Sequence, residues 1–290
     1  MHHSSGMRCP MKPWNTPAFV NLLNLAIAED LQTGDSTSES LIPEDAHCNA
    51  HIRAKSDCIV SGQAVAEIVF HRIDPSIRFE ASISDGNAAK SGTIVSRLNG
   101  NTRSILAGER LALNFMQRMS GIATMTHQMV NRIAGTRCRV IDTRKTVPGH
   151  RYLDKYAVRC GGGGNHRMNL GDGVLIKDNH IEAAGSVKTA VIHAMAHTRH
   201  TLRIQVEVTS LETAREAVGA GAGALLLDNM EPDEIRRIVM DLPEHVLCEC
   251  SGNITLETIR AYAETGVHLI SVGALTHSVQ AADLSLQIIR

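Results

Sequence analysis

Two carboxylates stand in apolar, strand-like runs where a charge is costly to bury. Glu207 lies between valines in "VEV", and Asp228 closes "LLLDN" one repeat later. Such a carboxylate must be paired or bound to a metal. No His or Cys spacing accompanies them, so their oxygens suit Mg²⁺, which usually also binds substrate phosphates. The alternative is a structural network in which both acids pair with Lys145 and Lys177.

A group of basic residues lies before the two acids in the sequence, between residues 144 and 177. Its members are Arg144, Lys145, Arg151, Arg159, Arg167 and Lys177. Arginine binds a carboxylate or phosphate through two parallel hydrogen bonds, and lysine acts as a point charge. The expected substrate is therefore strongly anionic. Arg151 and Arg159 are the two members that plain surface charge would also explain.

The stretch "CGGGGNHRMNLGDG", residues 160–173, places four glycines before Asn165. It has neither the Lys-Ser/Thr of a P-loop nor a GxGxxG helix start, so it does not predict a nucleotide-phosphate loop. We interpret the glycines as a compact turn that presents His166 and Arg167 to an anionic ligand. A lone histidine is more often a hydrogen-bonding group than an acid or base, and His166 is expected to bind rather than to transfer a proton.

The elements that must position these residues alternate from about residue 137 onward. The strand-like runs are "CRVIDT", "GVLIKD", "IQVEVT", "ALLLDN", "VLCECSG" and "HLISVGA", with amphipathic helical segments between the last four. This is the pattern of βα units in a parallel sheet. Each run ends in polar or small residues, namely 143–145, Lys177, Glu207, Asp228, 251–253 and Gly273. An incomplete α/β barrel, which brings all these strand ends to one mouth, is favoured over an open doubly wound sheet. The late runs "SGN" (251–253) and "SVGA" (271–274) suit phosphate-binding loops ahead of helices.

The earlier part of the chain has a different texture. Residues 17–32 have helical spacing, and residues 47–105 alternate in short segments typical of a small antiparallel sheet. A long helix is expected over 108–135, with a break near Ser120-Gly121. We therefore expect an N-terminal α/β sandwich domain, 17–113 joined by 277–290, and a barrel domain over 114–276.

Composition excludes several classes of protein. The 290 residues are 43% hydrophobic and 20% charged, which is typical of a globular protein. The net charge of -1 and the 3% aromatic content argue against a nucleic-acid or membrane-surface binder. No apolar run is long enough for a transmembrane helix. Residues 1–16 are expected to be a tag remnant or a disordered terminus. The seven cysteines form no CxxC pair and are expected to be reduced thiols of a cytoplasmic protein.

Together these motifs resemble quinolinate phosphoribosyltransferase, also called carboxylating nicotinate-nucleotide pyrophosphorylase. The resemblance covers nearly the whole chain and rests on residues 108–124, 142–181, 206–208, 225–229, 250–254 and 270–278. It implies a Mg²⁺-dependent reaction of quinolinate with 5-phosphoribosyl-1-pyrophosphate. The implied products are nicotinate mononucleotide, pyrophosphate and CO₂, in NAD synthesis. It also implies homodimers or larger assemblies with shared active sites.

The resemblance further implies a role for each matching residue. The residues implied for quinolinate are Thr143, Arg144, His166, Arg167 and Lys177, with Arg110 contributed by the neighbouring subunit. The residues implied for the phosphoribosyl substrate are Lys145, Glu207, Asp228, Ser251, Gly252, Asn253, Ser271, Val272 and Gly273. Lys145, Glu207 and Asp228 are the implied catalytic residues, and the two acids are the implied metal ligands.

Three alternatives remain open. One is a related barrel phosphoribosyltransferase acting on another aromatic acid such as nicotinate, although Arg144, His166 and Arg167 together favour a diacid. The second is a catalytically silent binding or scaffold protein of the same fold, which predicts the loss of charged residues at the mouth. The third is a lyase that forms a Schiff base on Lys145 or Lys177.

Overall fold

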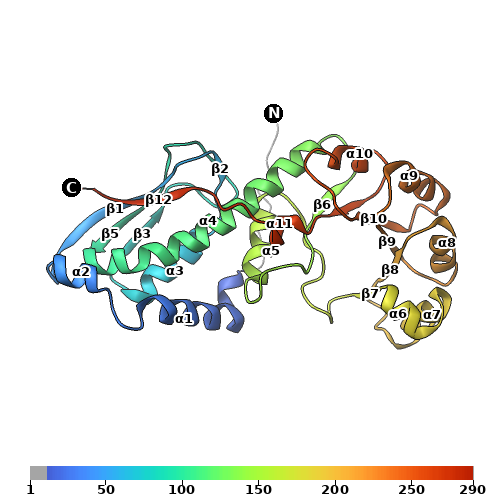
Figure 1. Ribbon diagram of the computed structural model, residues 1–290, viewed down its shortest axis with the longest axis horizontal. Coiled ribbons are helices and arrows are strands. Elements are labelled where there is room, and N and C mark those ends of the chain that lie inside the picture. The colour runs from blue at the N-terminus through green and yellow to red at the C-terminus, as the bar shows by residue number, and fades with distance from the viewer. Residues whose placement is uncertain (1–11, 290) are drawn as a thin grey trace. The chain divides into compact units, whose positions relative to one another are not determined.

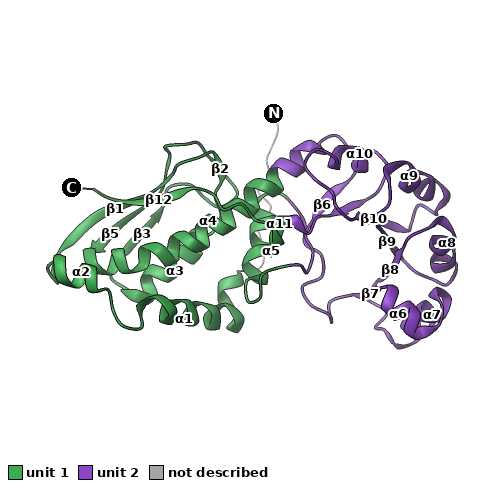
Figure 2. Cartoon of the chain, viewed as in Figure 1, with its two compact units in different colours: residues 1–127, 146–162, 275–290 green, residues 128–145, 163–274 purple. Residues whose placement is uncertain are grey.

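The computed structural model describes residues 12–289, which fall into two compact units (Figure 1, Figure 2). Unit 1 holds the residues up to 127, residues 146–162 and the segment from 275 onward. Unit 2 holds residues 128–145 and 163–274. The domain boundaries expected near residues 113 and 276 stay predictions.

Unit 1 is built on an antiparallel sheet with the strand order β12-β1-β5-β3. Its strands are β1 (His47–Ala54), β3 (Arg78–Ala81), β5 (Ile94–Asn101) and β12 (Leu284–Ile289). A separate ribbon pairs β2 (Cys58–Ile59) with β4 (Ala88–Ala89). The antiparallel sheet predicted from the alternation over 47–105 is confirmed.

The helices of unit 1 include one that the alternation did not predict. They are α1 (Pro17–Leu31), α2 (Ser36–Leu41), α3 (Gln63–Ile73), α5 (Arg151–Cys160) and the part of α4 (Thr102–Arg132) that ends at residue 127. The helix α1 matches the prediction for 17–32. The unexpected helix α3 buries Phe70, whose ring stacks on that of Phe79 in β3 with centroids 6.1 Å apart.

The helix α4 is continuous, so the break expected near Ser120-Gly121 is wrong. Gly121 serves close packing instead: a Cβ there would overlap the backbone carbonyl oxygen of Gln280. Glycine lowers the intrinsic stability of a helix but lets two backbones approach. The glycine that predicted a helix break therefore marks a close contact between two segments of backbone.

The N-terminal expectation is corrected in its described part. Residues 1–11 lie outside the described residues, but Pro13–Asn15 form the 3₁₀ helix η1 rather than a disordered leader. The Trp14 ring packs edge-on against that of Tyr156 at a centroid distance of 5.3 Å.

Unit 2 contains a six-stranded parallel sheet in the order β6-β11-β10-β9-β8-β7. Its strands are β6 (Arg139–Ile141), β7 (Val174–Ile176), β8 (Ile204–Val208), β9 (Ala224–Asp228), β10 (Leu247–Ser251) and β11 (Leu269–Ser271). This is the chain order closed into a ring and left open between β6 and β7. A doubly wound sheet would reverse direction in the middle of the order. The incomplete barrel is therefore confirmed and the doubly wound alternative is wrong.

Helices pack outside these strands (Figure 1). They are α6 (Asp178–Ala184), α7 (Val187–His197), α8 (Leu211–Gly219), α9 (Pro232–Asp241), α10 (Ile259–Ala263) and the start of α11 (Ala274–His277). In β8 the residues Ile204, Val206 and Val208 are buried, and the alternate residues Gln205 and Glu207 face the other side of the sheet. That inner side is the one that carries the polar residues.

The described cysteines are all free thiols. Cys248 and Cys250 are buried on one face of β10. Burial raises the pKa of the Cys138 thiol to about 12 and that of Cys248 to about 11, so both stay protonated near neutral pH. Over residues 12–289, no helix combines the length and apolar character that a membrane crossing requires.

Candidate active site

A cavity of about 390 Å³ lies at the carboxyl ends of the unit 2 strands. We call it the catalytic-face cavity. The sequence-predicted residues that line it are Thr143, Arg144, Lys145, His166, Arg167, Lys177, Asp228, Ser251, Gly252, Asn253 and Ser271. Strand ends far apart in sequence therefore converge, as a barrel requires.

The glycine run forms an ordered turn against β6. Gly164 bridges Ile141 in parallel fashion, and its amide donates to the carbonyl of Val140 at 2.8 Å. The buried Asp142 then accepts two bonds, from the His166 amide at 2.8 Å and from the Asn165 side chain at 2.6 Å. This carboxylate fixes the end of the turn, and with it the start of the His166-Arg167 pair.

Arg167 lies beside a second guanidinium in this cavity. Its Nη1 donates to the Gly173 carbonyl at 2.7 Å, while its buried Nε has no hydrogen-bond partner among residues 12–289. Burial lowers the pKa of the Arg167 guanidinium, and the charge of Arg144 lowers it further. A bound anion would relieve this repulsion and supply the missing acceptor.

The two predicted acids differ in their surroundings. Glu207 is not in the cavity lining, and its carboxylate accepts from Lys177 Nζ at 2.7 Å. Asp228 lines the cavity, and the side chain of Asn229 donates to it at 2.6 Å. The Lys177–Glu207 pair is one link of the structural network that the sequence left open.

The loops after β9 and β10 are shaped by left-handed residues. Asn229 and Asn253 have φ values of 53° and 49°, and Gly252 has a φ of 105°. A side chain at Gly252 would collide with the amide group of Asn229. Asn229, which also lines the cavity, was missed in the sequence, although its position directly after Asp228 at a strand end was the available signal.

The loop after β11 is only partly available to a ligand. Ser271 lines the cavity, and α11 begins directly after Gly273. The amide of Val272 already donates to the Ile141 carbonyl at 3.0 Å. Of the phosphate-loop residues predicted here, Val272 therefore has no free backbone donor.

Sequence reasoning also missed Glu249, in the middle of β10. Its exposure is 2%, and it lines the catalytic-face cavity. The strand register places Glu249 beside Leu226, which is itself level with Glu207. The signal was present, because "CEC" sets a carboxylate between apolar residues just as "VEV" does.

Arg110 belongs to unit 1, where it is an exposed residue of α4. It does not line the catalytic-face cavity. Its implied contribution to a neighbouring subunit's site stays a prediction.

The side chains that could donate to a metal ion do not form a large cluster in the described part of the chain. Nowhere in residues 12–289 do three or more His, Cys, Asp or Glu side chains gather in a way that could hold a metal ion. Mg²⁺ is commonly held by one or two carboxylates together with substrate phosphates. Asp228, at the cavity wall next to the Ser251 loop, suits that mode of binding.

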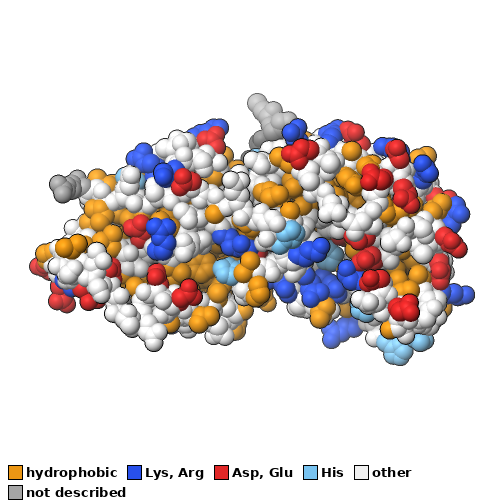
Figure 3. All heavy atoms as spheres, in the orientation of Figure 1, with side chains coloured by type: hydrophobic (Ala, Val, Ile, Leu, Met, Phe, Trp, Pro, Cys, Tyr) orange, Lys and Arg blue, Asp and Glu red, His pale blue; other side chains and the backbone are white. Residues whose placement is uncertain are grey.

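The surface around the cavity carries both signs of charge. Figure 3 shows lysine and arginine side chains gathered over the segment between β6 and β7, with acidic side chains close by. This local cationic group coexists with a net charge of -1. It fits a small anionic ligand better than an extended polyanion.

Comparison with known proteins covers both units. The family models described as quinolinate phosphoribosyl transferase N-terminal and C-terminal domains match residues 35–120 and 122–287. The chain is 43% identical over 267 residues to a probable nicotinate-nucleotide pyrophosphorylase [carboxylating] of Bacillus subtilis, covering 92% of each chain. It is 40% identical to the chloroplastic enzyme of that name from Arabidopsis thaliana, covering 98% of this chain and 86% of the other. The solved nicotinate-nucleotide pyrophosphorylase of Francisella tularensis superposes with a TM-score of 0.91 at 40% identity, covering 96% and 99% of the two chains.

Proposed function

The chain belongs to the quinolinate phosphoribosyltransferase family, and we propose that it transfers phosphoribosyl from 5-phosphoribosyl-1-pyrophosphate to quinolinate with loss of CO₂. The products are nicotinate mononucleotide, pyrophosphate and CO₂, and the reaction serves NAD synthesis. The single observation that carries this beyond family membership is the Arg144–Arg167 pair, two adjoining guanidiniums in one small cavity. A planar diacid offers one acceptor group for each of them.

In this proposal the two substrates bind to different groups of residues in the cavity lining. Arg144, His166 and Arg167 bind the carboxylates of quinolinate at one side. Asp228 and the 251–253 loop, from β9 and β10, bind the phosphoribosyl substrate at the other. This arrangement holds the ring nitrogen near the ribose C1, and positioning of this kind lowers the barrier without a covalent enzyme intermediate.

In the proposed reaction, bonds change first at the ribose C1 and then at the ring carbon beside the nitrogen. The ring nitrogen forms a bond to C1, the bond from C1 to the pyrophosphate oxygen breaks, and its electron pair leaves with the pyrophosphate. Lys145 stabilises that negative charge, and Asp228 stabilises the positive charge on the sugar. The bond to the carboxylate beside the alkylated nitrogen then breaks, its electrons pass to the ring carbon, and a proton replaces CO₂.

Mg²⁺ is the cofactor of this proposal. Asp228 would hold it, with Glu207 as a second carboxylate if Lys177 releases it. When bound, the ion neutralises the charge of the pyrophosphate. We further propose a cytoplasmic homodimer or larger homo-oligomer in which Arg110 reaches the neighbouring subunit's site.

A direct assay tests the proposal. The chain is incubated with Mg²⁺, 5-phosphoribosyl-1-pyrophosphate and quinolinate labelled in the carboxyl group beside the nitrogen. Equal amounts of nicotinate mononucleotide and labelled CO₂ are expected. Turnover of nicotinate but not of quinolinate would support the alternative substrate, and no turnover of either would support a silent binding protein. Trapping of a lysine adduct by borohydride with a carbonyl substrate would support the lyase.

A further inference from the structure

Asn229 joins the two loops that follow β9 and β10. Asp228 ends β9 and lies beside Ser251, at the end of β10, in the parallel pairing. The Asn229 amide donates to the Ser251 carbonyl at 2.9 Å, which adds one more backbone bond between the two segments. The Asn229 side chain donates from Nδ2 to Oδ2 of Asp228 at 2.6 Å. One residue therefore binds the carboxylate that ends one strand and the backbone of the neighbouring loop.

The backbone of Asn229 restricts which residue can stand there. Its φ of 53° lies in the left-handed region, which asparagine and aspartate tolerate better than most residues with side chains. Of these two, only asparagine has an amide hydrogen to donate to the neighbouring carboxylate. An ionised aspartate would instead place a second negative charge next to Asp228. The position therefore uses both the conformational tolerance of asparagine and its side-chain donor.

The Asn229 side chain is held in place by the loop after β10. Gly252 packs so closely against it that a Cβ at Gly252 would overlap the side-chain amide of Asn229. Nδ2 of Asn253 lies 3.5 Å from Oδ1 of Asn229, the amide atom that does not donate to Asp228. These contacts fix the direction of the amide, and with it the direction of the Asp228 carboxylate.

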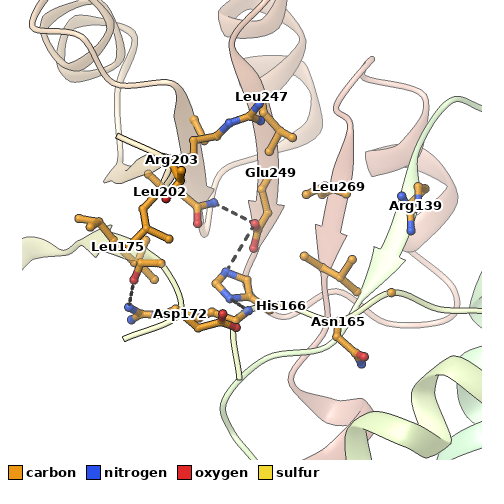
Figure 4. A pocket seen from close by; sticks show the side chains of 18 residues that line it. Arg139, Asn165, His166, Asp172, Leu175, Leu202, Arg203, Leu247, Glu249 and Leu269 are labelled. Atoms are coloured by element: carbon orange, nitrogen blue, oxygen red, sulfur yellow. Dashed lines mark hydrogen bonds and ion pairs between the residues drawn. The ribbon is translucent and has the colours of Figure 1, made fainter. Parts of the chain in front are cut away.

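The five residues joined in this way all line the catalytic-face cavity, namely Asp228, Asn229, Ser251, Gly252 and Asn253. None of them lines a second cavity of about 510 Å³, which reaches the amino-terminal ends of the strands at Arg139, Leu247 and Leu269 (Figure 4). The contacts of Asn229 are therefore confined to the carboxyl ends of the strands, where the proposed substrates bind.

The phosphoribosyl substrate has a nearly fixed span between its ring hydroxyls and its 5-phosphate. In the proposed function Asp228 meets the sugar, and the 251–253 loop meets the 5-phosphate. Two contact points that one residue links keep a constant separation, so binding does not have to order them.

We propose that Asn229 is a positioning residue for the phosphoribosyl substrate and holds the Asp228 carboxylate at a fixed place relative to the 251–253 loop. The inference rests on the proposed function for the identity of that substrate. Asn229 acts through Asp228 and is assigned no contact with a reacting atom.

Binding of ribose 5-phosphate, measured by calorimetry, tests the proposal without turnover. Asn229→Gly keeps the left-handed backbone and removes the side chain. We expect it to raise the Kd for ribose 5-phosphate about tenfold, as loss of a hydrogen bond to a charged group does. The Kd for benzene-1,2-dicarboxylate, a planar diacid expected at Arg144 and Arg167, should change less than about twofold. Asn87→Gly, in the exposed turn before β4, is the matched control and should change neither Kd.

Asn229→Asp separates the donor from the backbone. It keeps the shape and tolerates the left-handed conformation but cannot donate to Asp228 when ionised. We therefore expect it to weaken ribose 5-phosphate at least as much as Asn229→Gly does. In steady-state kinetics, both variants should raise the KM for 5-phosphoribosyl-1-pyrophosphate about tenfold and change the KM for quinolinate less than about threefold.

Three outcomes would overturn the proposal: wild-type affinity for ribose 5-phosphate in either variant, an equal loss of affinity for the diacid, or a wild type that does not bind ribose 5-phosphate. If Asn229→Gly does not fold, Asn229→Asp carries the same comparison of the two ligands. The proposed function fails separately, when the wild type binds ribose 5-phosphate but does not convert quinolinate. A tenfold weaker Kd in the variants would then still support the positioning role.

Discussion

Lys145 is the cation that best matches the departing pyrophosphate. It lies in the loop that follows β6, next to Arg144, and its amide donates to the hydroxyl of Thr143 at 3.0 Å. This short turn fixes the backbone from which the lysine side chain extends into the cavity lining. A fixed cation stabilises negative charge without reorganising when that charge develops.

Replacing Lys145 by methionine is therefore expected to lower kcat about tenfold to a hundredfold, while the fold is kept. Steady-state kinetics with saturating quinolinate measure the effect, and Lys188→Met, at the exposed start of α7, is the control. A normal rate in Lys145→Met would remove this residue from the mechanism.

The buried imidazole of His150 is expected to make the stability of unit 1 sensitive to acid. Burial lowers the pKa of its imidazole, Asp154 opposes this effect and Arg118 adds to it. The ring packs near that of Phe115 with centroids 5.9 Å apart. Because the folded state disfavours the imidazolium, the unfolded chain takes up a proton first as the pH falls below about 6.5.

The melting temperature of the wild type should therefore fall more steeply between about pH 7.5 and pH 5.5 than that of His150→Gln. The measurement is thermal unfolding followed by circular dichroism, with His245→Gln, at an exposed position, as the control. Parallel curves for the wild type and His150→Gln would contradict the role assigned to burial.

Sequence reasoning found most of the candidate site because its charges are unusual where they stand. Glu207 and Asp228 interrupt apolar strands, Arg144 follows a strand-like run, and Arg167 follows a glycine run. Asn229 and Glu249 were missed for physical reasons. The left-handed backbone of Asn229 and the burial of Glu249 next to Gln205 depend on neighbouring strands, which no single run of residues specifies.

At the scale of the element, α4 meets the backbone at Gln280 through a position without a side chain. Gly121 lies in mid-helix, where glycine costs about 1 kcal/mol relative to alanine. The intrinsic preference is outweighed by the contact with the backbone at Gln280. Backbone cannot move aside as a flexible side chain can, so any larger residue must separate the two segments.

Gly121→Ala is expected to destabilise the protein by about 2 kcal/mol or more, as overpacking of a close contact does. Gly219→Ala, at the end of α8, has nothing within reach of the added methyl group and should be neutral or slightly stabilising. Urea unfolding of both variants measures the difference. Equal stability of the two would show that α4 adjusts without cost.

Element prediction succeeded where the period was strong. The six strands of unit 2 were found from apolar runs that end in polar residues, and the strand order then follows from the barrel. The helix α3 was missed because its sequence, "QAVAEIVFHRI", is short and lies among alternating segments. Its helical state is favoured by the packing of Phe70 on Phe79, a tertiary contact that local pattern does not contain.

At the scale of the whole molecule, we propose that each active site takes Lys145 from one subunit and Arg110 from its neighbour. They lie in different units, and Arg110 is absent from the lining of the cavity that Lys145 enters. If each site takes its arginine from a neighbouring subunit, a mixed assembly contains one kind of site with both residues intact.

Mixing Arg110→Ala with Lys145→Ala subunits is therefore expected to restore activity, to about half of the wild-type value in isolated heterodimers and about a quarter in a random dimer mixture. The two variants carry different affinity tags, so that heterodimers are isolated before the assay. Heterodimers as inactive as either parent would place Arg110 outside its neighbour's site.

The strand pairings also determine when each sheet can be completed during synthesis on the ribosome. Arg139 of β6 pairs with Leu269 of β11, and Ala54 of β1 pairs with Leu284 of β12. Each sheet is therefore completed by a strand, β11 or β12, that is synthesised long after the first strands of that sheet. A nascent chain halted before residue 269 would leave β6 exposed as an unpaired edge, a ready template for aggregation. Chaperone dependence is therefore expected to end late in translation, when these two closing strands emerge.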